Sequence, residues 1–179
     1  MRAMADRGPR RLWLSRRHGP VLWILACTLM ASPAAANPAA ALPAQDWAYY
    51  GNARFGYALC YPAHLLRPQP EAANGDGRAF LGAGGAKLLV WGQYNALDQS
   101  LTEAMRADKA RLAAKGAVVT YQAARANWYV LSGRDRGQLF YWRRMLSRDR
   151  FTSFEFTYPA QAAALWNPVA ARLSRCLRP

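Results

Sequence analysis

Phe151-Thr-Ser-Phe-Glu-Phe-Thr-Tyr158 is the stretch that decides the fold of this 179-residue chain. Its aromatic and polar residues alternate, and successive side chains of a β-strand point to opposite faces. One face would carry Phe154, Phe156 and Tyr158, and the other would carry Ser153, Glu155 and Thr157. The stretch therefore predicts a strand with one apolar and one polar face.

The residues before this strand predict three more strands, at 117–123, 128–132 and 138–146. Short polar connections, Arg134-Asp-Arg-Gly137 and Ser147-Arg-Asp-Arg150, lead from one strand to the next. Since connections this short join neighbouring antiparallel strands, the four strands predict an antiparallel meander.

A helix is predicted at 101–115, directly before the meander. Ser100-Leu-Thr-Glu103 is a capping box, in which the serine hydroxyl accepts from the Glu103 amide and the glutamate carboxylate reaches back. Leu101, Met105 and Leu112 then recur at helical spacing, and Gly116 supplies a stop.

The ordered part of the chain is expected to begin at Trp47. Residues 57–61 predict a short apolar strand that Pro62 ends. Residues 78–81 and 87–91 flank a glycine-rich segment and predict a β-hairpin. The segment before this hairpin contains Pro68, Pro70 and Asn74-Gly-Asp-Gly77, which predict an irregular loop.

The last segment predicts a helix with one apolar face, formed by Ala162, Leu165, Val169, Leu173 and Cys176. Pro168 lacks a backbone donor, so this helix either restarts there with Asn167 as its cap or is kinked. Strands, helix, strands and helix in this order predict an α+β fold. We expect a largely antiparallel β-sheet of about six to seven strands sandwiched by two helices.

Two cysteines fall in this domain, Cys60 in the first predicted strand and Cys176 on the last helix. In an oxidising compartment a lone pair of cysteines is most simply a disulfide. The alternatives are two buried thiols or a thiol that pairs with a partner. A redox pair would usually be C-x-x-C, which is absent. We predict a Cys60–Cys176 disulfide.

The first forty residues indicate the compartment. Six arginines precede the short apolar run 21–30, and small residues then end in Ala34-Ala-Ala36, which together are typical of a secretory signal peptide. The run is too short for a membrane-spanning helix, which needs about 20 apolar residues. The predicted parts are a signal peptide at 1–36, cleavage between Ala36 and Asn37, a flexible leader at 37–46 and one domain at 47–179.

Two other modes of export stay open. Arg10-Arg-Leu-Trp-Leu14 is similar to a twin-arginine motif, although a merely basic segment explains it too. Cys27 follows Ile24-Leu-Ala26, which is a poor match to a lipoprotein cleavage box because the leucine is bulky. We therefore expect a soluble periplasmic or secreted protein without a transmembrane segment.

The chain after Ala36 is basic, with 24 − 6 = 18 basic and 10 − 1 = 9 acidic side chains. An anionic envelope component such as phospholipid or lipopolysaccharide would explain the excess, and so would the Arg-rich and Ala-rich bias of GC-rich coding. The candidate contacts are Arg125, Arg148 and Arg150, because alternate turns of a meander lie at the same end of the sheet. Arg134 and Arg136 would lie at the other end.

No catalytic or metal-binding motif is complete in this sequence. The nucleophile elbow G-x-S-x-G is absent, and His64, in a turn, is the one histidine after the predicted cleavage site. Glu71 and Asp76 are the only acidic residues close together in a loop, and they are a weak acid/base pair. The segment 82–87 lacks the spacing of a phosphate-binding loop. We expect no cofactor, no metal and no nucleic-acid partner.

Six segments resemble a family of small exported proteobacterial proteins of unknown function. They are 52–62, 74–80, 87–92, 127–133, 140–142 and 154–159, and in this order they span most of the predicted domain. The family is similar in layout to the α/β/α sandwich of PsbP, the extrinsic photosystem protein. The resemblance implies a mostly non-catalytic fold group of lumenal or periplasmic binding and assembly modules, with no catalytic residue to transfer.

The function expected from the sequence is therefore that of a non-enzymatic secreted or periplasmic module, which binds or assembles another cell-envelope component. Two alternatives stay open. One is an envelope hydrolase with an unrecognised site, and the other is a binder of anionic lipid or lipopolysaccharide.

Overall fold

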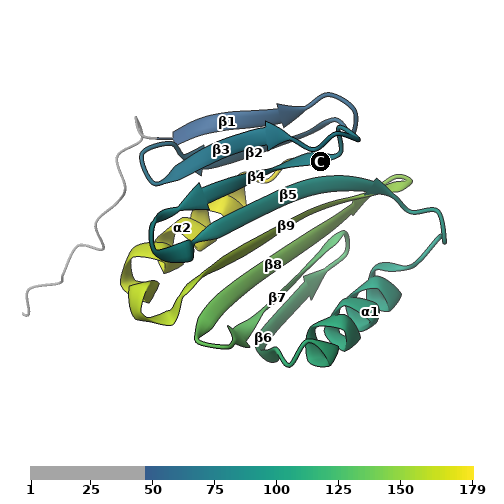
Figure 1. Cartoon of the computed structure of the whole chain (residues 1–179). Coiled ribbons are helices and arrows are strands. Elements are labelled where there is room, and N and C mark those ends of the chain that lie inside the picture. The colour runs from purple at the N-terminus through teal and green to yellow at the C-terminus, as the bar shows by residue number, and fades with distance from the viewer. Residues whose placement is uncertain (1–46) are drawn as a thin grey trace, which may run out of the picture. The chain divides into compact units, whose positions relative to one another are not determined.

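The meander predicted around Phe151 forms one half of a seven-stranded antiparallel sheet in the computed structural model, which describes residues 47–179 (Figure 1). Its strands are β6 (Val118–Arg125), β7 (Trp128–Asp135), β8 (Gln138–Ser147) and β9 (Arg150–Pro159). The strand order is β3-β4-β5-β9-β8-β7-β6. The signal peptide at 1–36, its cleavage site at Ala36 and Asn37, and the leader at 37–46 lie outside the described residues.

The other half of the sheet contains the predicted hairpin and one strand that was not expected. The hairpin is β4 (Gly77–Gly82) and β5 (Lys87–Tyr94), joined by the short 3₁₀ turn η2 (Ala83–Gly85). The irregular loop predicted around Pro68 and Pro70 is partly wrong, because β3 (Leu66–Glu71) pairs with β4 there. Proline cannot donate to a ladder, but β3 is an edge strand, and its register shifts between Pro68 and Glu71.

A separate two-stranded sheet consists of β1 (Trp47–Asn52) and β2 (Tyr57–Pro62), the second of which was predicted. Side chains of this hairpin, of the sheet and of the last helix share one core. That core includes Leu59 of β2, Phe80 of β4 and Phe156 of β9. The hairpin and the last helix therefore cover the same face of the large sheet.

The last helix, α2 (Ala163–Cys176), follows the 3₁₀ turn η3 (Ala160–Ala162) and runs through Pro168 without a break. The alternative of a restart capped by Asn167 is thus excluded, and Asn167 instead accepts a hydrogen bond from Tyr158. The predicted apolar face is partly wrong, because Leu165 is 45% exposed. The buried stripe is Trp166, Val169, Ala170 and Leu173, whose i, i+3, i+4, i+7 spacing faces the sheet.

The predicted disulfide is present. Cys60 lies in β2, and Cys176 is the last residue of α2. Their Cα atoms are 5.8 Å apart and their sulfurs are bonded. The bridge therefore ties the end of the chain to its second strand.

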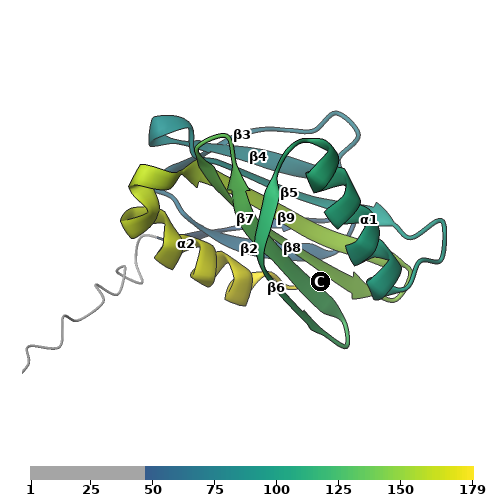
Figure 2. The same ribbon diagram turned by 90° about the horizontal axis from the view of Figure 1, so that it is seen from below.

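The first helix, α1 (Leu101–Ala114), covers part of the opposite face of the sheet, and Figure 2 shows strands lying between the two helices. Both halves of the predicted capping box are formed: Ser100 Oγ accepts from the Glu103 amide at 3.2 Å, and Glu103 accepts from the Ser100 amide at 2.8 Å. The buried side of α1 is Ala104, Asp108 and Leu112. It joins a second core with Tyr129, Leu131 and Phe140. Within residues 47–179 neither helix is both long and apolar enough to span a bilayer.

Candidate functional site

One part of the sheet has no covering layer among residues 47–179. On the face that α1 shares, the helix contacts β6 and β7, so β3, β4 and β5 lie beyond it. Strand alternation places Ala79, Leu81, Leu89 and Trp91 on that uncovered part. Leu81 is 44% exposed, and Leu89 and Trp91 are half-buried. We call these four residues, together with Pro70 of β3, the open face.

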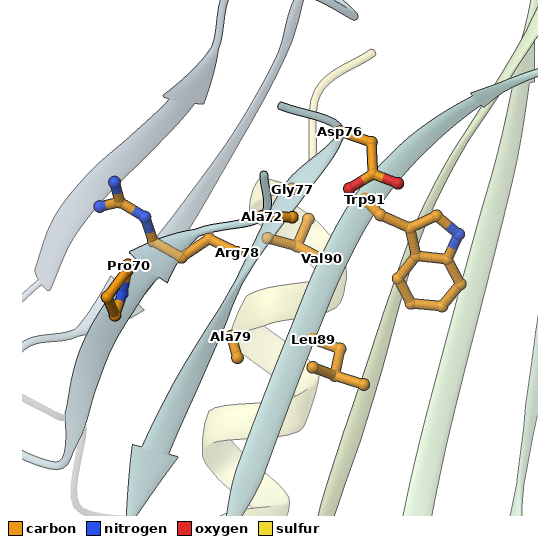
Figure 3. Close-up of a pocket in the computed structure, with 9 residues that line it drawn as sticks. All are labelled: Pro70, Ala72, Asp76, Gly77, Arg78, Ala79, Leu89, Val90 and Trp91. Atoms are coloured by element: carbon orange, nitrogen blue, oxygen red, sulfur yellow. The ribbon is translucent and has the colours of Figure 1, made fainter. Parts of the chain in front are cut away.

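The open face contains a hollow of about 290 Å³. Figure 3 shows the side chains of Leu89 and Trp91 on β5, with Ala79 on β4 and the Asp76 carboxylate beside the indole of Trp91. Arg78 points away, and its guanidinium stacks 5.0 Å from the ring of Tyr50 on the other side. The hollow is therefore an apolar surface with one acidic group at its rim.

Gly77 contributes to the shape of this hollow because it pairs with Trp91 in the ladder. A Cβ atom at Gly77 would lie 1.9 Å from the carbonyl oxygen of Val90, so no side chain fits. The indole of Trp91 is consequently left uncovered by its cross-strand partner.

A pair of tryptophans links the open face to α1. The rings of Trp91 and Trp142 meet edge to face at 5.2 Å, and the Arg111 guanidinium of α1 lies 4.3 Å from the Trp142 ring. The Trp142 Nε1–H is buried and donates to no atom of the described residues. These contacts fix the position of the Trp91 ring in the surface, because the Trp142 ring packs against it.

A second hollow, of about 380 Å³, lies between the C-terminal end of α1 and strands β8 and β9. Leu112, Lys115, Gln138, Phe140, Glu155 and Thr157 are among its lining residues. Burial raises the pKa of Glu155, while the nearby charges of Arg111 and Lys115 oppose this shift. No hydrogen bond or ion pair within residues 47–179 engages the Glu155 carboxylate, so it is available to accept from a ligand.

A buried ionic cluster fixes α1 beside this hollow. Asp108 accepts a hydrogen bond from Tyr129 and forms an ion pair with Arg144 at 3.1 Å, and Arg144 also donates to Ser153 at 3.0 Å. Burial is the main cause that raises the pKa of Tyr129. Sequence reasoning missed Asp108. The sequence did contain an indication of it. Asp108 lies four residues after Ala104 and four before Leu112, so it shares their buried face of α1.

The three arginines predicted for anionic contact do lie at one end of the sheet. Arg125 ends β6 and stacks over Trp128 at 5.9 Å. Arg148 lies in the β8–β9 turn and is exposed, and Arg150 begins β9 and pairs with Asp149 at 3.3 Å. They are not in mutual contact, because Arg125 and Arg150 are separated by β7 and β8.

The two carboxylates considered for acid/base chemistry have separate partners. Glu71, now in β3, accepts from Tyr50 at 2.5 Å and from Asn52 at 3.1 Å. Asp76 accepts from the Asn74 side chain at 2.8 Å at the rim of the first hollow. The structure thus holds Glu71 in a polar network with β1 and leaves Asp76 beside the open face.

His64 and the glycine-rich segment lie at the other end of the sheet. His64 is an exposed residue between β2 and β3, and it lines a hollow with Leu65, Arg67 and Leu81. The segment 82–87 is the turn of the β4–β5 hairpin, as predicted. Among the described residues, no three His, Cys, Asp or Glu side chains are grouped so that they could hold a metal ion.

No family model and no curated protein matches this sequence. Among solved structures, the chain is similar to the solution structure of cyanobacterial PsbP (CyanoP) from Synechocystis sp. PCC 6803. The TM-score is 0.58 with 14% identity, over 76% of this chain and 94% of that chain. At this identity the likeness establishes the fold alone, so this chain has a PsbP-like α+β fold.

Proposed function

We propose that this protein is a non-enzymatic binding module of the cell envelope, which holds an apolar segment of another envelope protein on the open face. The observation that carries the proposal is the apolar hollow over Leu89 and Trp91, on a part of the sheet that no described element covers. An apolar surface rimmed by polar groups is typical of protein–protein contact sites.

Opposite charges at the two ends of the open face would orient the bound segment. Asp76 lies at the Trp91 end of β5, and the exposed Lys87 begins the same strand. Trp91 lies four positions after Lys87 along the strand, which is about 13 Å. A partner segment with a basic group at one end and an acidic group at the other would match both charges, while apolar side chains between them enter the hollow.

Site-specific photocrosslinking in the envelope tests the proposal. A photoreactive residue at Leu81 or at Leu89 should capture the same protein, whereas one at Tyr49, which is 77% exposed on β1, should not. Ala79→Arg fills the hollow and should abolish capture from Leu81, while Tyr49→Arg should leave it intact. Equal capture from Tyr49, or capture from Leu81 that survives Ala79→Arg, would contradict the proposed face.

The proposed location is the periplasm or the exterior. A disulfide is stable in oxidising compartments and rare in the cytosol, which agrees with the signal peptide expected at 1–36. The protein isolated from the envelope should begin at Asn37. An intact Met1 terminus on cytoplasmic protein would contradict this location.

A second candidate function, an envelope hydrolase, is favoured by one observation. Glu155 is a half-buried carboxyl group with a raised pKa beside a hollow. Groups of this kind act as general acids in hydrolases. Glu155→Gln distinguishes the two functions. It should abolish hydrolysis if the second candidate is correct, and it should leave capture from Leu89 unchanged if the first is correct.

A further inference from the structure

Five connections of the chain meet at one end of the sheet. One is the β3–β4 loop, where the Gly92 amide donates to the Asp76 carbonyl at 2.9 Å. In the ladders, Tyr94 at the end of β5 lies opposite Arg150, and the Asn95 amide donates to the Asp149 carbonyl at 2.7 Å. Arg150 Nη1 also donates to the carbonyl of Phe55, in the β1–β2 turn, at 3.3 Å. The β6–β7 turn lies at the same end, and in Figure 1 these connections lie toward the right, near the label C.

Arginines gather on this end from seven separate places: strands β6, β8 and β9, helix α2, two turns and the residues after α2. We call them the arginine end, and they are Arg54, Arg125, Arg143, Arg148, Arg150, Arg175 and Arg178. Two of them share one aromatic ring: Arg125 and Arg143 both lie over Trp128, at 5.9 and 4.4 Å. Arg178 donates to the Arg175 carbonyl at 3.2 Å. Burial and then the charge of Arg178 lower the pKa of Arg143.

Few acidic side chains oppose these arginines. Asp149 pairs with Arg150, and Asp98 lies on the neighbouring β5–α1 loop. Asp76 lies at this end too, in the β3–β4 loop, whose Asn74 carbonyl accepts a hydrogen bond from Arg54. The described residues as a whole carry 18 basic and 8 acidic side chains, or 18 − 8 = +10. Positive charge is therefore in excess at this end, as it is over the described residues as a whole.

Two apolar side chains stand out from the same end. Leu97 is 80% exposed and Tyr94 is 52% exposed. Tyr94 ends β5, and Leu97 lies on the connection after it, which the Asn95–Asp149 hydrogen bond attaches to the β8–β9 turn. The Tyr94 ring packs on Phe55 at 5.2 Å and lies 5.9 Å from the Arg150 guanidinium. The end is thus both basic and apolar.

We propose that the arginine end docks the domain on an anionic phospholipid surface, with Leu97 and Tyr94 entering the headgroup layer. Arginines beside a tyrosine and an exposed leucine are the combination that binds an anionic membrane interface. Because the arginines come from several turns and form no single groove, a broad planar surface matches them better than one acidic peptide. Docking on the end leaves the open face, on the side of the sheet, accessible.

Binding to vesicles tests this docking. The chain from Asn37 is suitable, because residues 47–179 supply both cores and the disulfide. It should bind vesicles that contain phosphatidylglycerol and not vesicles of phosphatidylcholine, and binding should weaken with salt. The double variant Arg125→Gln/Arg148→Gln should lower the partition coefficient about 30-fold, which corresponds to about 2 kcal/mol for two arginines.

The matched control is Arg134→Gln/Arg136→Gln, which removes two charges from the opposite end of the sheet, about 30 Å away along β8. It should change the partition coefficient less than threefold. Leu97→Ser should weaken binding several-fold with no change in charge. Inorganic phosphate at constant ionic strength should not displace the protein from the vesicles. Displacement would contradict docking on a membrane surface and would indicate a site for free phosphate.

Equal losses from the two double variants would overturn the proposal, because they would indicate attraction by net charge alone. Equal binding to both kinds of vesicle, or no binding to phosphatidylglycerol vesicles at low salt, would overturn it as well. All of the substituted side chains are exposed, so each variant should keep the melting temperature of the parent protein, which is measured alongside.

Discussion

Reduction of the Cys60–Cys176 disulfide should destabilise the domain strongly and should free α2 first. The two cysteines are 116 residues apart in the sequence. In the chain-entropy model, a closed loop of about 116 residues restricts the unfolded state by about 5 kcal/mol at 25 °C. The unfolding entropy of a domain of about 133 residues is near 0.28 kcal/mol per kelvin, so the melting temperature should fall by about 15–20 °C.

The assay is thermal unfolding of oxidised and reduced protein, followed by circular dichroism, with hydrogen exchange read by mass spectrometry. Reduction keeps every core atom in place, so it isolates the effect of the crosslink from that of a cavity. Cys176→Ser should behave like the reduced protein. Amides of α2 should lose protection before those of β8, because α2 is attached to the hairpin through Cys60. Two free thiols in unfolded, unreduced protein, or a shift of only a few degrees, would refute this account.

Three further predictions concern other side chains. Asp108→Ala should cost about 3–5 kcal/mol in chemical denaturation because it leaves a buried guanidinium unpaired, whereas Asp149→Ala, at an exposed pair, should cost less than about 1 kcal/mol. The pKa of Glu155 is raised in the folded state, because burial disfavours the ionised carboxylate. Ionised Glu155 therefore destabilises the fold at pH values above its folded-state pKa. This destabilisation vanishes when the pH falls below the ordinary glutamate pKa. Glu155→Gln should therefore raise the melting temperature at pH 7 and leave it unchanged near pH 4; a gain that does not depend on pH would refute this. Trp166→Ala should cost about 3–5 kcal/mol and Leu165→Ala less than about 1 kcal/mol, and similar costs would contradict the observed register of α2.

The sequence by itself predicted those elements whose determinants are close together in the chain. The alternation of residues 151–158, the capping box at Ser100 and the polar turns of the meander are local patterns, and each forms the expected element. The disulfide was also predictable, because only two cysteines remain after the expected cleavage site and each lies on an apolar face.

The tertiary structure alone decided what depends on distant partners. Pro68 and Pro70 are typical of a loop, yet they lie in a strand that pairs with β4. This is possible because β3 is an edge strand, in which a residue without a backbone N–H need not donate to a second neighbour. Which face of α2 is buried depends on the side chains that the sheet can accommodate. Trp166 packs against Phe156 and is buried, whereas Leu165, which was expected on the buried face, is exposed. Asp108 became identifiable only when folding brought Tyr129 and Arg144 to it.

The open face follows from the same long-range geometry. Leu89 and Trp91 have the sequence pattern of core residues, and they would be core residues if α1 extended over β4 and β5. Hydrophobicity predicts that a face is buried but does not specify by what, because burial is set by the lengths and positions of distant elements. Here α1 packs on β6 and β7, and no element of residues 47–179 covers those side chains.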